Sequence, residues 1–429
     1  MDDKKKEKRA DGDDYDPHDF RVVENPETLV HIIKGSLGTG ILAMPEAIRN
    51  AGLILGFTST FIIGALCIYC FLVLIKAQYI LCKRHRVPIL TYPESMRLAL
   101  SEGPDCLKFL SAASFYIVDG FLITFQMGIC CVYVVFVAEN LKQFFDAYVV
   151  TLDVKIHICI IFFPLLLICM IRDLKTLAPV STLGNVLTFI GFGIVLYYIF
   201  IKLPPITDTN YVGEIENYPL YFGTVLFALE SVGVFITLEN NMKKPKSFPP
   251  VFSYGMAFIV ILYALIGFFG YWRYGEDCHG SITLNLPKDE ALAQSVRIIF
   301  TLAIYISYAL QGYVPVDIVW NQYLKKRCEG SDKLLLYEYL IRTANVVITC
   351  LLALAIPRLG LFISLFGALC LSVLGFIFPA TLDLCVHWPD ELGPFKYILI
   401  KDILITLLGF TGMVCGTYCA IRDIIGSFQ

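Results

Sequence analysis

The sequence is short of charge, and the charge it has is unevenly placed. Charged residues make up 17% of the 429 residues and hydrophobic residues 57%, whereas an ordinary soluble domain carries about 25% charged residues. Residues 1–24 alone hold 15 of the 71 charged residues (34 basic and 37 acidic). No soluble fold has enough interior for so much apolar surface. The composition excludes a soluble protein and indicates a membrane protein behind a charged tail.

Several functional signatures are also missing. The net charge is −3 and no basic block suited to nucleic acid occurs, so we expect no nucleic-acid partner. No His-x-x-x-His, Gly-x-Ser-x-Gly or paired-aspartate motif is present, so we expect no enzyme and no catalytic residue. The 15 cysteines lie mostly in apolar runs, without the spacing of a metal site or a disulfide framework. We therefore expect no metal and no cofactor.

Residues 1–24 have no apolar core of the kind that a signal peptide needs. Their composition is typical of a disordered tail, and we expect that tail in the cytoplasm. No Asn-x-Ser/Thr sequon occurs, so glycosylation gives no clue to sidedness. Residues 25–429 are expected to form one transmembrane domain.

Eleven apolar segments predict an all-α polytopic membrane protein. A bilayer core of about 30 Å needs roughly 20 apolar residues per helix, and no strand-like alternation competes with this interpretation. The stretch Tyr92–Gly103 is too polar to span, and we expect a short cytoplasmic helix there. The expected membrane helices are 27–48, 53–81, 109–141, 154–171, 176–201, 218–240, 250–272, 292–323, 335–356, 359–386 and 398–421.

Lysine and arginine predict the orientation. With the N-terminus in the cytoplasm, the inner connections carry 21 of the 34 basic residues. The outer connections and the C-terminus carry 7, which are Lys142, Lys155, Lys202, Arg273, Lys288, Arg358 and Arg422. This threefold bias predicts a cytoplasmic N-terminus and an extracytoplasmic C-terminus.

The first and sixth segments contain poor helix formers at mid-span. Residues 35–40 read GSLGTG, and residues 228–233 read ALESVG with Glu230 among them. These are the first segments of two five-helix blocks, 27–201 and 218–386, and an odd number of helices gives the blocks opposite topologies. Broken helices at matching places in inverted repeats indicate the substrate site of a secondary transporter. The alternative is a pair of packing glycine motifs.

The predicted breaks suggest what the site binds. A half-helix starting near Gly38–Ile41 would present free N–H groups to a carboxylate. A half-helix ending near Phe227–Leu229 would present carbonyls to an ammonium group. The two poles together describe a zwitterion, and an α-amino acid is the simplest one.

Two ionisable residues lie beside the breaks. Intramembrane ionisable groups are functional candidates by default, and histidine titrates near neutral pH. His31 is thus a candidate for proton coupling, or a neutral residue that serves packing. Glu230 is a candidate for the same role or for the substrate amine.

For further polar residues, the sequence does not decide whether they line the central cavity or pack between helices. Glu46 and Arg49 form a gate pair or a solvated pair, and Asp119 has no obvious partner. The candidate substrate-binding residues are Gly35, Ser36, Gly38, Thr39, Gly40, Tyr133, Phe227, Ala228, Glu230, Ser231, Gly233, Ser307, Tyr308, Gln311 and Gly312.

At these residues the chain resembles the proton-coupled amino acid transporters, a branch of the amino acid/auxin permease family with a LeuT-like inverted-repeat fold. The first segment, NPETLVHIIKGSLGTGILAMPEAIRNAG, matches the family at His31, Lys34-Gly35, Gly38-Thr39-Gly40, Pro45 and Asn50-Ala51-Gly52. QMGICCVYVVFVAENLKQ, FALESVGVFITLENNMKKP and SYALQGYVP are similar to its third, sixth and eighth helices. The motifs run in order from residue 25 to about 424, and the pattern looks most like the insect members.

The resemblance implies uptake of small amino acids with a proton, His31 being the coupling residue, and sodium is not expected. Ser231 stands where members often have glycine, and Gly312 stands where an aromatic residue is usual. If Gly312 faces the pocket, a larger substrate side chain would fit. The second hypothesis is an amino acid sensor that signals to a growth pathway through cytoplasmic partners and transports little. The expected location is the plasma membrane, the lysosomal membrane or both.

Overall fold

The computed structural model describes most of the chain as helices. Of residues 174–181 and Lys326 it describes the backbone alone. The described residues are 28–29, 32–33, 36, 38–172, 174–201, 203–206, 209–229, 247–328, 333–389 and 391–428. The predicted tail 1–24 lies outside them.

The first half of the chain supplies helices that closely follow the predicted segments. The short polar helix expected from Tyr92 is α5, and its first turn is closed by a capping box in which Thr91 and Glu94 bond each other's backbone N–H. The elements are α3 (Thr39–Ala51), α4 (Leu53–His85), α5 (Tyr92–Glu102), α6 (Asp105–Lys108), α7 (Ser111–Tyr148), α8 (Val154–Cys169) and α9 (Leu174–Phe200).

The second half of the chain is also helical and contains two π-helical stretches in the part that the structure describes. η6 (Ile318–Leu324) extends α13, and η8 (Gly367–Ile377) separates α15 from α16. Such stretches arise where an extra residue widens a helical turn. The α-helices are α10 (Tyr218–Leu229), α12 (Phe248–Tyr274), α13 (Ala291–Asp317), α14 (Leu334–Ala355), α15 (Leu359–Phe366), α16 (Phe378–Val386) and α17 (Tyr397–Gly426).

Within the described residues, eight helices are long and apolar enough to cross a membrane. α8 is apolar but shorter, and the first and sixth predicted segments fall partly outside the described residues. The all-helical membrane class is therefore confirmed, while the count of eleven and the inverted repeat stay predictions.

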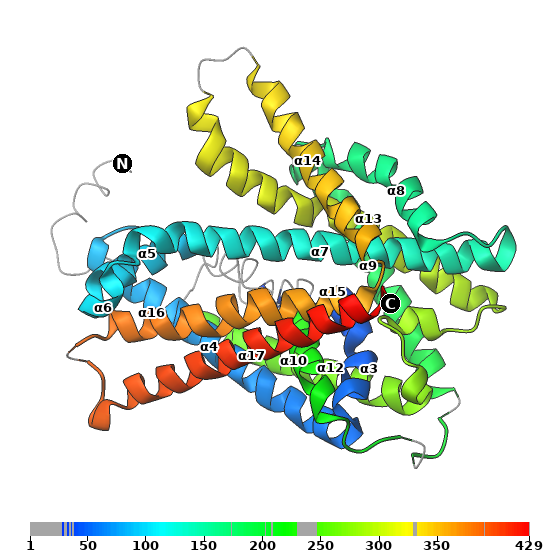
Figure 1. Cartoon of the computed structure of the whole chain (residues 1–429), viewed down its shortest axis with the longest axis horizontal. Coiled ribbons are helices and arrows are strands. Elements are labelled where there is room, and N and C mark those ends of the chain that lie inside the picture. Colours follow the sequence, from blue (N-terminus) through cyan, green and yellow to red (C-terminus); the bar gives the residue numbers. More distant parts are fainter. Residues whose placement is uncertain are drawn as a thin grey trace, which may run out of the picture.

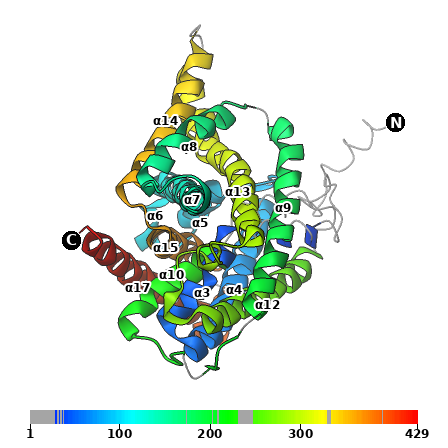
Figure 2. The same cartoon turned by 90° about the vertical axis from the view of Figure 1, so that its right-hand side faces the viewer.

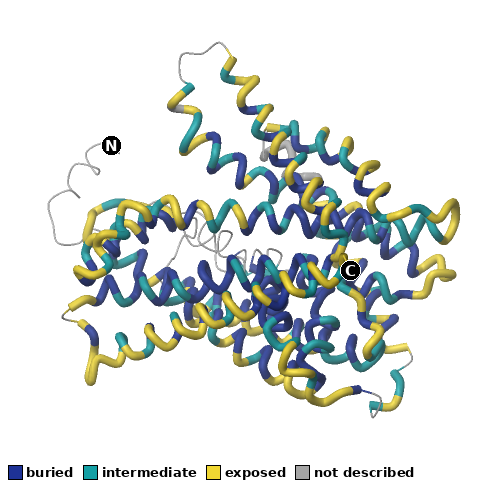
Figure 3. Tube along the Cα trace, in the orientation of Figure 1, coloured by how far each residue is buried: buried dark blue, intermediate teal, exposed yellow. Residues whose placement is uncertain are grey.

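Figure 1 shows α7 running along most of the molecule, and α15 packs beside it. In the end-on view of Figure 2, α7 lies among other helices whereas α17 lies at the edge. Burial agrees, because 67% of the most apolar stretch of α7 is buried against 17% in the segment that contains α17. Figure 3 shows the buried residues gathered where α3, α7, α10 and α15 meet. That centre is where the candidate site lies.

Candidate functional site

The first described helix begins where the sequence predicts a half-helix to begin. Gly38 has extended backbone geometry (φ −128°, ψ −156°), and α3 starts at the next residue, Thr39. Within the described part of the chain, no side chain caps this helix start. The first N–H groups of a helix have no partner within the helix and carry partial positive charge. The start of α3 therefore offers donors that suit a carboxylate.

A tyrosine from α12 holds the backbone just before this helix start. The Tyr263 hydroxyl donates to the Ser36 carbonyl, which also accepts from the Gly38 N–H at 2.9 Å. Tyr263 is fully buried. Carbonyls freed by interrupted helix geometry must find donors inside a membrane, and at Ser36 the protein supplies two of them.

The side-chain position of Gly38 is little crowded by the described residues. Among their atoms, the nearest to a Cβ built there is the Tyr133 hydroxyl of α7, at 3.8 Å. Tyr133 also hydrogen-bonds with Gln311 of α13, and Gln311 accepts from the Gln126 amide of α7. Gly38, Tyr133 and Gln311 thus come together, as the sequence analysis expected of site residues.

Gly40, in contrast, has no space for a side chain. A Cβ built there would lie 2.6 Å from the Cα of Ala228, so α3 and α10 pack backbone against backbone. α10 is described as far as Leu229, and Phe227 packs edge-on against Phe125 with 6.0 Å between ring centroids. Gly40 and Ala228 are therefore brought together, but as a packing contact that brings the end of α10 close to the start of α3.

Two other predicted residues point away from Gly38. The Tyr308 hydroxyl shares a 2.7 Å hydrogen bond with Thr349 of α14. A Cβ at Gly312 would meet the Asn345 amide at 3.4 Å and the Cys130 thiol at 3.8 Å. Both residues thus face α14 rather than α3.

Gly312 lines a cavity of about 10 Å³ together with Cys169, Arg342 and Asn345. That volume is about one water molecule. Space left by a missing aromatic ring at Gly312 is therefore small in this structure. The remaining candidate on α13, Ser307, donates to the Ala303 carbonyl of its own helix at 2.9 Å.

Five predicted site residues lie outside the described residues. They are His31, Gly35, Glu230, Ser231 and Gly233. The proton-coupling candidates and the second predicted break are among them, so these stay predictions.

The pair Glu46 and Arg49 lies at the far end of α3. The two side chains are 3.5 Å apart and about one-fifth to one-quarter exposed. Arg49 also donates to the carbonyls of Cys278 and Glu276 in the loop after α12, and Glu46 abuts Gly360 at the start of α15. The pair bridges three elements, which fits the gate alternative better than a solvated pair.

Three polar contacts in the structure were not predicted from the sequence. Asp119, for which it found no partner, accepts a 2.5 Å hydrogen bond from Tyr323 of η6. Tyr263 and Gln126 were not singled out, although each is a polar residue inside an apolar segment. The polarity of these two residues is visible in the sequence. The sequence does not show to which neighbouring helix each side chain points.

The described site is suited to binding rather than to bond chemistry. It combines uncapped N–H groups, a tyrosine hydroxyl and amide groups, and it contains no nucleophile beside a base. Among the described residues no group of three or more His, Cys, Asp or Glu could hold a metal ion. The arrangement can hold a small polar ligand away from water.

Comparisons with known proteins agree with this chemistry. Residues 22–422 match the family described as transmembrane amino acid transporter protein. The chain is 40% identical to a proton-coupled amino acid transporter-like protein of Drosophila melanogaster, pathetic, over 97% of this chain and 90% of that protein. It is 27% identical to vacuolar amino acid transporter 4 of Saccharomyces cerevisiae, over 92% of this chain but only 57% of the yeast protein.

Solved structures with little sequence similarity share the fold. A nucleobase-cation-symport-1 family transporter with bromovinylhydantoin bound superposes with a TM-score of 0.54 at 12% identity, covering 95% of this chain and 94% of that one. A Na⁺-coupled sialic acid symporter in an outward-open state gives 0.51 at 13% identity, covering 93% and 90%. The predicted LeuT-like architecture is thus supported at the level of the fold.

This chain belongs to the transmembrane amino acid transporter family. Its relatives are transporters and not enzymes, and the predicted resemblance, including that to insect members, is confirmed. An amino acid substrate and a membrane environment follow from the family.

Proposed function

We propose that this family member carries amino acids into the cytosol by alternating access, coupled to protons. The observation that supports this most is the start of α3, where Gly38 carries no capping side chain and lies beside Tyr133, and where Thr39 is buried. The substrate carboxylate would accept from the first N–H groups of α3, and the Tyr133 hydroxyl would donate to it. The substrate amine would lie toward the carbonyls at the end of α10.

Alternating access requires the two sides of the site to close in turn. On the side of Glu46 and Arg49, the loop after α12 and the start of α15 are held against the end of α3. We propose that these contacts form the external gate. Opening would break the Arg49 bonds to the loop carbonyls and separate Glu46 from α15.

We propose the proton, not sodium, as the coupling ion. Sodium-coupled transporters use backbone carbonyls at the helix break as ion ligands. The Ser36 carbonyl already accepts from Tyr263 and from Gly38, which weakens it as an ion ligand. His31 is the residue proposed to carry the proton, with Glu230 as its alternative, because both combine an ionisable group with a position at membrane depth.

The proposed location is the lysosomal membrane, the plasma membrane or both, with a cytoplasmic N-terminus. The yeast relative is named as vacuolar, which favours an internal acidic compartment here. Fluorescence microscopy of the tagged chain beside lysosomal and surface markers tests the location. Protease protection of tags at the two ends tests the orientation.

The test of function is uptake into proteoliposomes. Purified protein would be given a panel of radiolabelled amino acids with and without an inward proton gradient. We expect at least one amino acid to accumulate, and to accumulate more with the gradient. Equal uptake with and without the proton gradient would refute proton coupling. Binding of an amino acid without any uptake would favour the sensor hypothesis. His31→Ala should remove the gradient dependence while the protein stays folded.

A further inference from the structure

A second carboxylate lies beside the proposed external gate. Glu139 of α7 interacts with the Glu46 carboxylate of α3 and with the backbone N–H of Leu359, the first residue of α15. Its Oε2 atom is buried, and no described residue donates to it. At the next residue of α15, Gly360, a Cβ would lie against the Glu46 carboxylate. Acidic side chains from two helices therefore come together at the start of a third.

The loop after α12 packs against the same place. Arg49 donates to the Cys278 and Glu276 carbonyls of this loop, and a Cβ at Gly280 would lie 2.8 Å from the Gly360 nitrogen. Cys278 itself is only 1% exposed. α3, the loop and the start of α15 thus limit the access of water to the two carboxylates.

One described cation serves both carboxylates. Arg49 lies 3.5 Å from Glu46. Glu139 has no basic partner among the described residues, and Glu46 is the charged side chain that acts on it. The other titratable side chains on the surrounding elements are engaged elsewhere or exposed. Lys142 pairs with Asp146, Arg297 donates to backbone carbonyls, Arg273 lies over the Tyr274 ring, His157 hydrogen-bonds to the Asp153 carbonyl, and Glu276, Asp277, His279 and Arg358 are exposed.

The two carboxylates lie outward of the proposed substrate site. Glu139 is six residues beyond Tyr133 on α7, and Glu46 is seven beyond Thr39 on α3. These separations correspond to about 9–11 Å along each helix, or about two turns. A change at the pair can therefore act on the gate without contact with the substrate.

We propose that Glu139 binds a proton and that this proton closes the external gate. Two negative charges beside one cation are costly away from water, and a proton on Glu139 removes that cost. The proposal rests on the gate proposed above and adds a proton-binding group besides His31 and Glu230. When Arg49 leaves the loop, water reaches Glu139 and stabilises its charged form. Closure removes that water, so the closed gate holds the proton more tightly, and by linkage external acid favours closure.

Infrared difference spectroscopy of the full-length protein in nanodiscs tests proton binding, because a protonated carboxyl group has its own C=O band. Between pH 5 and pH 8 the wild type should lose such a band, and Glu139→Gln should lack this change. Glutamine resembles the neutral acid and keeps an acceptor for the Leu359 N–H. Glu139→Asp retains an acid and should retain the change. Identical spectral changes in the wild type and Glu139→Gln would overturn the proposal.

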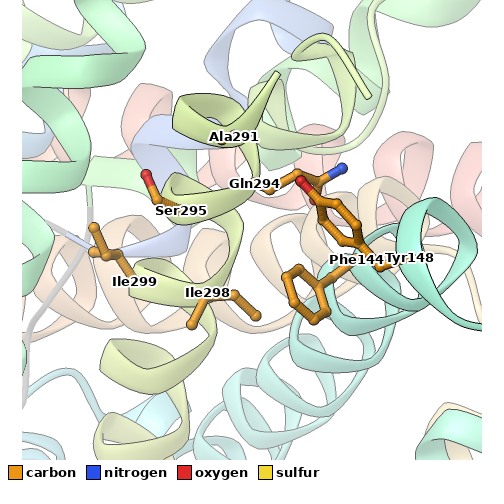
Figure 4. Close-up of a pocket in the computed structure, with 7 residues that line it drawn as sticks. All are labelled: Phe144, Tyr148, Ala291, Gln294, Ser295, Ile298 and Ile299. Atoms are coloured by element: carbon orange, nitrogen blue, oxygen red, sulfur yellow. The ribbon is translucent and has the colours of Figure 1, made fainter. Parts of the chain in front are cut away.

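Asp146→Asn is the matched control. Asp146 lies in the next turns of α7, where Phe144 and Tyr148 line a surface hollow against α13 (Figure 4). Its carboxylate has a cation of its own, Lys142, at 2.5 Å. The infrared change of this variant should equal that of the wild type. Loss of the band in Asp146→Asn but not in Glu139→Gln would assign the proton to the wrong residue and overturn the proposal.

The buried Cys278 reports on the gate. Its labelling by a membrane-impermeant maleimide, measured by mass spectrometry of the peptide, should require the loop to open. At pH 8 the wild type should react about five- to tenfold faster than Glu139→Gln, an ordinary coupling factor, and at pH 5 the two should react alike. Comparison at one pH removes the effect of pH on the thiol itself.

Equal labelling of the wild type and Glu139→Gln at both pH values would overturn the link between the proton and the gate. Uptake is not measured in either experiment. A protein that binds amino acids without carrying them would thus refute the proposed function and leave the infrared and labelling results unchanged.

Discussion

Gly38 and Gly40 are two residues apart, yet their surroundings differ completely. Among the described residues, a Cβ at Gly38 would have no neighbour closer than 3.8 Å, whereas a Cβ at Gly40 would lie 2.6 Å from the Ala228 backbone. Glycine at 40 lets two helices touch, while glycine at 38 leaves room beside an uncapped helix start. Gly40 thus serves packing, whereas Gly38 is the residue of this motif that we propose for binding.

The two faces of α13 differ in the same way. Gln311 points to Gln126 and Tyr133 beside Gly38. Tyr308 and Gly312 point to α14. Substitutions on the first face should change transport, and those on the second face should change packing.

The largest expected effect is that of Gly40→Val. Its side chain has no space against Ala228, and forcing extra atoms into a packed interior costs about 1–3 kcal/mol or more. We expect a lower melting temperature in detergent and little folded protein. Gly193→Val is the control, because a Cβ there has nothing within 4 Å. Equal stability of the two variants would contradict the packing role.

Gly38→Ala should separate binding from folding. The added methyl group fits the protein but occupies the space next to Tyr133. We expect wild-type thermal stability with about a tenfold loss of uptake kcat/KM, the order of effect that one misplaced carbon has in a pocket. Wild-type uptake in this variant would place the substrate elsewhere.

Tyr263→Phe tests the backbone before α3. It removes one of two donors to the Ser36 carbonyl, and an impaired buried acceptor costs about 1–3 kcal/mol. We expect an effect at the low end, since the Gly38 N–H remains. Uptake kinetics should show a lower maximal rate. If sodium then stimulates uptake, the hydroxyl has been weakening a cation site.

Gly312→Ala should have little effect on selectivity. The new Cβ would contact the Asn345 amide at 3.4 Å and face away from Gly38. We expect the ranking of amino acids in a competition panel to match the wild type. A shift toward smaller substrates would show that Gly312 does limit substrate size, as the sequence comparison suggested.

The smallest effect concerns His387, which follows α16 on the predicted cytoplasmic side. Its hydrogen bond to the Asp383 side chain raises the pKa of this buried imidazole, although burial opposes the shift. A raised pKa in the folded state stabilises the protein below the unfolded pKa of about 6.5. That stability is lost as pH rises through the folded value.

Thermal stability measured from pH 5 to 9 should therefore fall slightly with rising pH in the wild type, and less so in His387→Gln. Parallel pH profiles for the two proteins would contradict this contribution.

Much of the fold was predictable from the sequence because the bilayer dictates helix length. The expected segments 53–81 and 335–356 became Leu53–His85 and Leu334–Ala355. The start of α3 was also predictable, because Gly35, Gly38 and Gly40 are poor helix formers at mid-span.

The contacts were not predictable, because periodicity in an all-apolar helix does not say which face meets which neighbour. Nothing in the sequence showed that Tyr263 reaches Ser36, or that Gly312 faces Asn345. The partner of Asp119, Tyr323, lies more than two hundred residues away, and only the three-dimensional packing of α7 against η6 joins them.

The central claim is that the amino acid sits at the start of α3. An experimental structure of the protein with a transported amino acid bound tests it most directly. Our account predicts ligand density beside Gly38 and Tyr133, with the carboxylate within hydrogen-bond distance of the first N–H groups of α3. Density elsewhere, for example beside Gly312 and Asn345, with the start of α3 left unoccupied, would contradict it.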